Sequence, residues 1–173
     1  MDKTLSDLAA KQEITEVIYR YCRGLDRMDR ELALSVWHAD GTADWGSMYQ
    51  GLGSGFIEWV WDAHAGFERH SHQVTNILID VDGERAVSES YVTVALWARP
   101  DPLQVLELVG RGRYADRWSR VEGRWAIEHR RYISDLQTTT KIPIENAESS
   151  VEGRRDTSDA SYAVLGSLTN TAG

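Results

Sequence analysis

HQVTNILIDVDGERAVSESYVTVALWAR, residues 72–99, is the stretch of this chain that decides its fold class. Two runs rich in β-branched and aromatic residues, 72–81 and 86–99, flank Asp82-Gly83. Such runs are typical of strands, and Asp-Gly is typical of tight hairpin turns. The stretch therefore predicts two long antiparallel strands joined by a short connection.

Two more strands are predicted downstream. The run 105–120 follows Pro100-Asp101-Pro102, and the run from Trp125 to about Thr139 follows the turn signal Glu122-Gly123. The third run is interrupted by Gly110 and Gly112, and such glycines permit a bend or bulge in a curved strand.

Upstream of this sheet the period changes to that of helices. Apolar residues from Leu5 to Leu25 recur at i, i+3 and i+4, which predicts one long helix with a buried face. A second helix is expected from about Arg30 to Trp37, capped by Asp29, and a third from about Ser54 to Phe67. The glycine-rich segment between them is expected to hold a small hairpin around residues 43–45 and 48–50.

Three helices followed by four antiparallel strands indicate an α+β fold, with the helices on one face of a bent sheet. A curled sheet with helices across its mouth leaves a cone-shaped cavity. We expect one domain over residues 1–142. Residues 143–173 are polar with weak periodicity, and we interpret them as an arm along a neighbouring subunit or as disorder.

Charge and composition restrict the partners. A net charge of -8 argues against a nucleic-acid backbone as partner. No apolar stretch approaches the length of a membrane span, and the first residues do not resemble a signal peptide, so a cytoplasmic protein is the expectation. The single cysteine, Cys22, excludes an internal disulfide and is expected to be a buried thiol.

Two short segments carry the candidate chemistry. YCRGLD, residues 21–26, closes the first helix, and HSHQVTN, residues 70–76, opens the first long strand. If the fold brings Asp26 to His72, the pair forms a general base with an orienting carboxylate, which needs neither metal nor cofactor.

The order of elements, with Tyr-x4-Asp at residues 21–26 and His-x-x-Thr-Asn at residues 72–76, resembles the SnoaL-like branch of the nuclear transport factor 2-like superfamily. The chain is most similar to lindane dehydrochlorinase, scytalone dehydratase and the bile-acid 7α-dehydratases, over about residues 5–135. This resemblance implies a cone-shaped α+β barrel, in which three N-terminal helices pack on a strongly curved antiparallel sheet.

The resemblance also implies site residues. Asp26 and His72 match the family's dyad, and Tyr21 matches a tyrosine of the dehydratases. Arg130 matches an arginine that lines the dehydrochlorinase pocket, although strand parity would favour Arg131 unless a bulge intervenes. The dehydratases carry a further polar residue on the second long strand, where this chain offers only residues 92–95.

The implied function is a cofactor-free lyase acting on a small, hydrophobic, ring-bearing molecule. His72 would remove a proton, Asp26 would orient the imidazole, and Tyr21 and Arg130 would assist the leaving group. That group is water, halide or formaldehyde. The alternatives are an isomerase or cyclase of the same family, and a non-catalytic binding or assembly module.

Three further expectations concern surroundings and assembly. Trp45, Trp61 and Tyr49 are candidate substrate-binding residues, although packing in the core explains them equally well. His70-x-His72 could form half of a metal site, but no third ligand is suitably spaced, so we predict no metal and no cofactor. Apolar residues on one side of the second long strand predict a homodimer or homotrimer.

Overall fold

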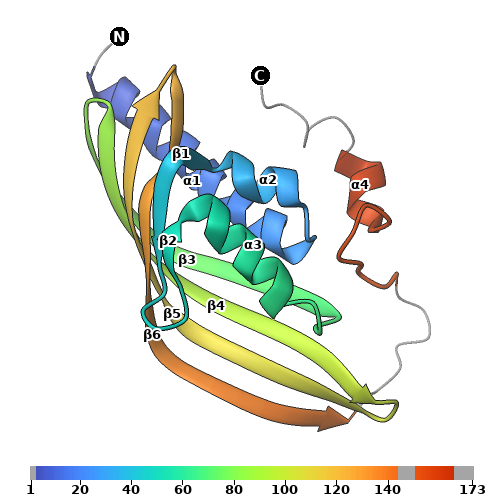
Figure 1. Ribbon diagram of the computed structural model, residues 1–173. Helices are drawn as coiled ribbons and strands as arrows, with labels where there is room; N and C mark the ends of the chain where they lie inside the picture. The colour runs from blue at the N-terminus through green and yellow to red at the C-terminus, as the bar shows by residue number, and fades with distance from the viewer. Residues whose placement is uncertain (1–2, 144–150, 166–173) are drawn as a thin grey trace.

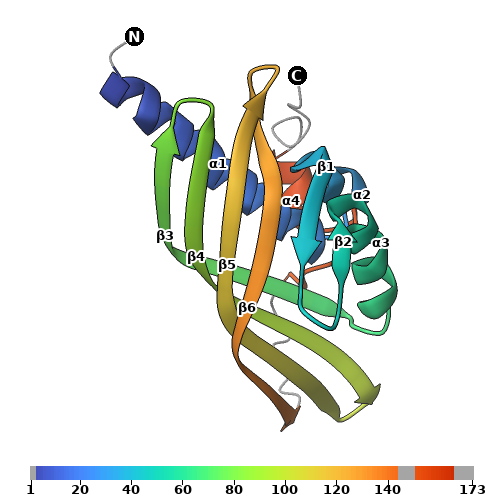
Figure 2. The same ribbon diagram turned by 60° about the vertical axis from the view of Figure 1, so that its left-hand side comes forward.

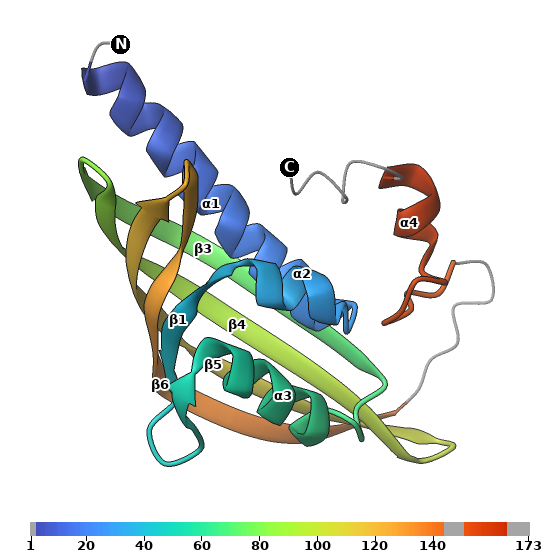
Figure 3. The same cartoon turned by 45° about the horizontal axis from the view of Figure 1, so that its top comes forward.

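Three helices lie across the concave face of one strongly bent sheet (Figure 1), and Figure 3 shows the same arrangement from above. The computed structural model describes residues 3–143 and 151–165. The helices are α1 (Lys3–Asp26), α2 (Arg30–Ser35), α3 (Gly53–Ala63) and α4 (Ala160–Leu165). The strands are β1 (Trp37–Asp44), β2 (Gln50–Leu52), β3 (Arg69–Asp82), β4 (Arg85–Asp101), β5 (Gln104–Val121) and β6 (Arg124–Pro143).

The α+β class and the curved sheet under three N-terminal helices are confirmed. The sheet has the order β2-β1-β6-β5-β4-β3, and Figure 2 shows these strands side by side. Strands β3 to β6 form the predicted antiparallel meander. Because β2 and β3 are both edge strands, the sheet is open and does not close into a barrel.

The sheet differs from the prediction in having six strands and one parallel pair. Trp37, expected to end the second helix, begins β1 and lies opposite Ile127 in a parallel pairing of β1 with β6. The helix stops early because the chain turns into the sheet, where the Ile127 N–H donates to the Val36 carbonyl at 2.9 Å. Helix α3 is also shorter than expected and ends at Ala63.

Several local predictions are confirmed. The Asp29 side chain accepts a hydrogen bond from the backbone N–H of Leu32 at the start of α2. Gly83 has φ +61°, while Glu122 and Gly123 have φ +54° and +78°. Hairpin connections of two residues use such positive φ values because they match the strand twist.

Two bulges in β6 set which side chains face the helices. Arg117 pairs with His129 while Trp118 pairs with Ile127, so Glu128 is the extra residue. A second register shift leaves Asp135 extra, opposite Arg111 and Gly112. A Cβ at Gly112 would collide with the Ile133 carbonyl, which explains why a glycine stands there.

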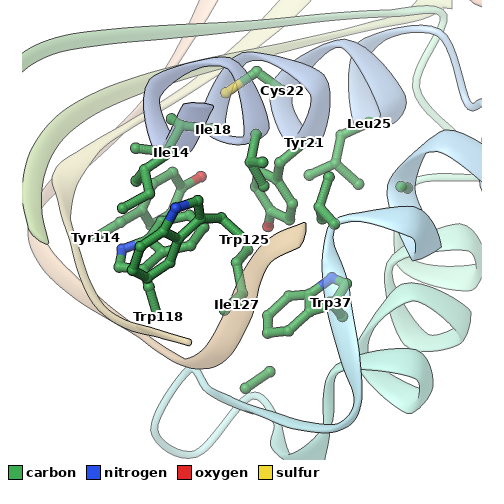
Figure 4. Close-up of a cluster of buried hydrophobic side chains, with 14 of the residues drawn as sticks. Ile14, Ile18, Tyr21, Cys22, Leu25, Trp37, Tyr114, Trp118, Trp125 and Ile127 are labelled. Atoms are coloured by element: carbon green, nitrogen blue, oxygen red, sulfur yellow. The ribbon is translucent and has the colours of Figure 1, made fainter. Parts of the chain in front are cut away.

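The core lies between α1 and the inner face of the sheet (Figure 4). Ile14, Ile18, Tyr21 and Leu25 of α1 lie over the buried indoles of the sheet. Those fully or nearly fully buried tryptophans are Trp37, Trp118 and Trp125. Much of the aromatic content is therefore structural.

The outer face of the sheet carries exposed apolar side chains. Val87 and Tyr91 of β4 are about half exposed, alternating with the buried Ser88 and Ser90. Assembly into a dimer or trimer through this face remains a prediction. No helix in the described ranges 3–143 and 151–165 is long and apolar enough to cross a membrane.

Part of the C-terminal tail contacts its own domain. In the segment 151–165, Asp159 pairs with Arg27 at 3.6 Å, and Tyr162 donates to Asp29 at 3.3 Å. This segment contains α4 and lies beyond the end of α1. The other residues of the predicted arm, 144–150 and 166–173, lie outside the described part of the chain, and contact with a neighbouring subunit stays a prediction.

Candidate active site

The predicted contact between Asp26 and His72 is present. The Nδ1 atom of His72 lies 2.6 Å from Oδ1 of Asp26. The same carboxylate accepts the backbone N–H of His72, at 3.1 Å to Oδ1 and 3.0 Å to Oδ2. The two backbone contacts hold the start of β3 against the end of α1, and the contact at Nδ1 fixes the orientation of the ring. Because a carboxylate accepts, a neutral imidazole in this position carries its proton on Nδ1.

Secondary structure brings the two residues together. Asp26 is the last residue of α1, and its side chain projects from the end of the helix toward β3. His72 lies near the start of β3, where its backbone N–H can reach the helix end. Gly24 allows α1 and α2 to pack closely beside this junction, because a Cβ there would press on the backbone of Ala33 in α2 at 2.8 Å.

A pocket of about 240 Å³ contains the dyad. It lies between α1 and β3, and we call it the dyad pocket; its lining residues are Tyr19, Cys22, Arg23, Asp26, Arg27, His72 and Val74. The His72 side chain is only 3% exposed, and the Asp26 side chain is 16% exposed. No residue of the described chain hydrogen-bonds to Nε2 of His72, so this atom is available to a ligand.

Tyr21 lies behind the dyad. Its ring meets the His72 ring edge to face, with centroids 6.5 Å apart, and it also contacts Trp37 and Tyr114. Burial raises the pKa of the Tyr21 phenol above its ordinary value, although the nearby Arg130 charge opposes this. The phenol therefore remains protonated, so its O–H can donate a hydrogen bond or act as a weak acid.

Arg130, rather than Arg131, faces the interior. The bulge at Glu128 reverses the parity of β6, so that Arg130 turns inward and Arg131 pairs with Asp44 at the surface. The Arg130 side chain is completely buried and binds Asp116 through two bonds of 2.7 and 2.8 Å. Its guanidinium lies 4.3 Å from the ring centroid of Tyr21.

Arg130 does not line the dyad pocket. Its contact with the site runs through Tyr21, whose ring contacts both Arg130 and His72. Burial disfavours the charge of Arg130, but the Asp116 carboxylate more than compensates and raises the pKa. One donor, Nη1, is buried without a partner in the described structure.

Sequence reasoning missed three polar residues on the inner face. Asp116 is buried beside Arg130, and Ser88 and Ser90 of β4 are also buried. Ser88 links Asp116, at 3.4 Å, to the Trp118 indole N–H, at 2.9 Å. Asp116 follows Tyr114 and precedes Trp118 at the spacing of one strand face, and this pattern could have revealed it.

The three aromatic residues proposed for substrate binding lie away from the dyad pocket. Trp45 stacks on Phe56 with centroids 3.9 Å apart, and Tyr49 donates from its hydroxyl to the Leu52 carbonyl. Trp61 lies under the Arg30 guanidinium. A role for Trp45, Tyr49 and Trp61 in substrate binding stays a prediction.

Cys22 is a buried thiol, as expected. Burial raises its pKa to about 12, so the thiol is not a nucleophile near neutral pH. Across residues 3–143 and 151–165, no group of three or more metal-binding side chains occurs. His70 donates from Nδ1 to the Leu25 carbonyl at 3.1 Å, instead of facing a common site with His72.

A contact between the tail and His70 lies beside the dyad. Arg155 donates to the carbonyls of His64 and Ala65 at 2.9 and 3.2 Å, and its Nη1 lies 3.3 Å from Nε2 of His70. Because the Leu25 carbonyl can only accept, Nδ1 of His70 carries the proton and Nε2 accepts from Arg155. A protonated His70 could not accept this bond.

We therefore expect the tail to loosen in acid. Burial lowers the pKa of His70, and the charges of Arg155 and His72 act in the same direction, against the Leu25 carbonyl and Asp26. Burial also lowers the pKa of the adjacent His64, to about 3. Docking of the segment 151–165 favours the neutral forms of His64 and His70. The docked state is therefore fully stabilised above the ordinary histidine pKa of about 6.5, and it weakens as the pH falls below that value.

The measurement is the ¹⁵N heteronuclear NOE of residues 151–165 between pH 8 and pH 5. We expect the NOE values to fall with pH in the wild-type protein and to be low at every pH in Arg155→Ala. Order that is unchanged across this range would show that the His70 contact does not hold the tail.

Comparison with known proteins gives a family and a fold. The model of the SnoaL-like domain family matches residues 6–131. No curated protein sequence matches the chain. Many solved structures do match, and those described next share 14–24% of their residues with this chain, which is a likeness of fold alone.

Three of these structures illustrate the range. A candidate scytalone dehydratase from Novosphingobium aromaticivorans DSM 12444 has 19% identity and a TM-score of 0.71, over 86% of this chain and 99% of its own. A hexachlorocyclohexane dehydrochlorinase, LinA type 2, has 14% identity and a TM-score of 0.70, over 87% and 99%. The D26N form of Rv3472, a protein of unknown function from Mycobacterium tuberculosis, has 24% identity and a TM-score of 0.67, over 99% and 93%.

Proposed function

Because the chain belongs to the SnoaL-like domain family, we propose that it is a cofactor-free lyase whose general base is His72. The observation that carries this proposal is the 2.6 Å contact between Asp26 and Nδ1 of His72 inside a pocket. Similarity in fold to a dehydrochlorinase and a candidate dehydratase supports an elimination rather than a transfer reaction.

The proposed step follows from the orientation of the ring. Nε2 of His72 removes a proton from the carbon next to the one that carries the leaving group. The electrons of the C–H bond form the new double bond, and the leaving group departs with its bonding pair. Asp26 stabilises the imidazolium, which then returns its proton to the departing group or to water.

Two further residues complete the proposal. The Tyr21 phenol supplies a protonated, buried hydroxyl behind the imidazole. Arg130 does not line the dyad pocket, so its proposed part in the reaction runs through Tyr21, whose ring centroid lies 4.3 Å from its guanidinium. The leaving group is water or halide, or formaldehyde is released instead. In that case His72 removes the hydroxyl proton of a hydroxymethyl group, the freed O–H electrons form the C=O bond of formaldehyde, and the electrons of the broken C–C bond stay on the substrate, which takes up a proton.

An isomerase using a deep carboxylate base is the weaker alternative. The sheet does contain a buried carboxylate, Asp116, but Arg130 binds both of its oxygens. Both carboxylate oxygens are thus engaged by the guanidinium, and neither faces the dyad pocket. His72 is thus the better candidate for proton abstraction.

The test uses the wild-type protein treated with a chelator. It is incubated in D₂O with one-ring alcohols, chlorides and hydroxymethyl compounds that carry an acidic C–H or O–H. We expect release of water, chloride or formaldehyde with formation of an alkene or enolate product, undiminished by chelation. Products with the substrate's composition apart from incorporated deuterium would indicate an isomerase. The absence of both turnover and deuterium exchange would contradict a catalytic role.

A further inference from the structure

Besides Asp26 and His72, the lining of the dyad pocket includes two arginines, Arg23 and Arg27. Arg23 lies in the last turn of α1 and Arg27 directly follows the helix, on either side of Asp26 in sequence, and both line the pocket with His72. The Arg27 N–H donates to the Arg23 carbonyl at 3.0 Å, so the two residues lie one turn apart and their side chains share one side. A ligand in contact with His72 therefore lies beside two guanidinium groups.

Both arginines retain unsatisfied donors. The Nε atoms of Arg23 and Arg27 are buried, and neither has a hydrogen-bond partner in the described chain. A buried donor without an acceptor is costly, and a ligand oxygen would remove that cost. The Asp26 carboxylate binds the backbone and ring of His72, and in the described chain it accepts from neither Nε atom.

The charges at the pocket favour an anion. The Nε of Arg27 forms an ion pair with Oδ1 of Asp159 at 3.6 Å, beyond hydrogen-bond distance, and that carboxylate accepts instead from the Arg154 N–H and from Ser161. Arg23 contacts only neutral groups of the tail, with the Ser161 hydroxyl at 3.4 Å and the Tyr162 ring centroid at 4.9 Å. Within the described ranges, Arg23 has no carboxylate partner.

We infer that the substrate carries a carboxylate, which binds to Arg23, with Arg27 in support, while its reacting carbon faces His72. The inference rests on the proposed function, and it narrows the substrate from a hydrophobic ring compound to a small ring-bearing acid. A pocket of about 240 Å³ suits one ring with a carboxylate rather than a steroid. Guanidinium groups bind carboxylates through charge-assisted, often bidentate, hydrogen bonds.

Binding of benzoate and benzamide tests this inference without knowledge of the substrate. The two probes have nearly the same shape and differ in charge. We expect benzoate to bind the wild-type protein at least about tenfold more tightly than benzamide, since charged hydrogen bonds are the stronger ones. Shifts of the His72 ring signals on titration would place the probe in the dyad pocket.

Three variants separate charge from structure. Arg23→Gln should abolish the preference for benzoate, Arg23→Lys should keep part of it, and Arg20→Gln should leave it unchanged. Arg20 is a matched control on the same helix, because it pairs with Glu16 at the surface and does not line the pocket. Melting temperatures of all three verify that they fold.

Equal binding of benzoate and benzamide to the wild-type protein would overturn the inference. So would a loss of the benzoate preference in Arg20→Gln as large as the loss in Arg23→Gln. Kinetics separate it from the proposed function. Turnover of neutral ring compounds at the rate of the matching acids would contradict the carboxylate site and leave the lyase intact. An Arg23-dependent preference for benzoate in a protein that catalyses no elimination would support the anion site and contradict the lyase.

Discussion

His72→Ala lowers kcat/KM for the elimination by about 10²–10⁴, the usual contribution of a positioned general base. Asp26→Asn lowers kcat/KM by a similar factor. The new amide can donate to Nδ1 and so hold the ring with its proton on Nε2, and a protonated Nε2 cannot act as a base. The measurement is steady-state kinetics on the best substrate of the elimination screen.

Controls for these variants follow from the contacts of Asp26. Because its carboxylate also accepts the backbone N–H of His72, Asp26→Asn could loosen the junction of α1 with β3. Circular dichroism and the melting temperature must therefore show a folded protein. Asp7→Asn, which removes a surface ion pair with Lys3 on the same helix, should keep full activity. Unchanged kinetics in His72→Ala would rule out this histidine as the base.

Asp116→Asn should cause the largest loss of stability. The change leaves the guanidinium of Arg130 buried without its counter-charge, and breaking one partner of such a pair typically costs about 3–5 kcal/mol. For a domain of this size the melting temperature should fall by roughly 10 °C. Urea unfolding at neutral pH, followed by tryptophan fluorescence, measures the change.

The double variant Asp116→Asn with Arg130→Gln provides the control. It removes both charges and keeps groups able to hydrogen-bond to each other, so it should recover a large part of the lost stability. If Asp116→Asn proves as stable as the wild-type protein, or if the double variant is worse than either single change, the ion pair does not stabilise the core as described.

Local sequence patterns were sufficient for the helices and the meander. The spacing along α1, the cap at Asp29 and the turn at Glu122-Gly123 each act over a few residues, so they can be read without the tertiary structure. Trp37 was misplaced because its apolar side chain fits a helix face and a strand equally well. Only its pairing with Ile127 across the sheet decides between them.

The site shows the same division. Element ends alone left open whether Asp26 and His72 meet, and the resemblance to the SnoaL-like family implied their pairing. The choice of Arg130 over Arg131 depended on one extra residue, Glu128, which no local pattern reveals. The contacts of the tail with Arg23, Arg27 and His70 were also beyond prediction, because they join polar residues more than 80 positions apart in a segment of weak periodicity.

The central claim is that Asp26 holds His72 with a free, basic Nε2, and a long-range ¹H–¹⁵N spectrum of the imidazole nitrogens tests it most directly. At a pH where the ring is neutral, we predict a proton on Nδ1 and none on Nε2 in the wild-type protein, and a shift toward the other tautomer in Asp26→Asn. A proton on Nε2 of the wild-type ring, or identical spectra for the two proteins, would contradict the account.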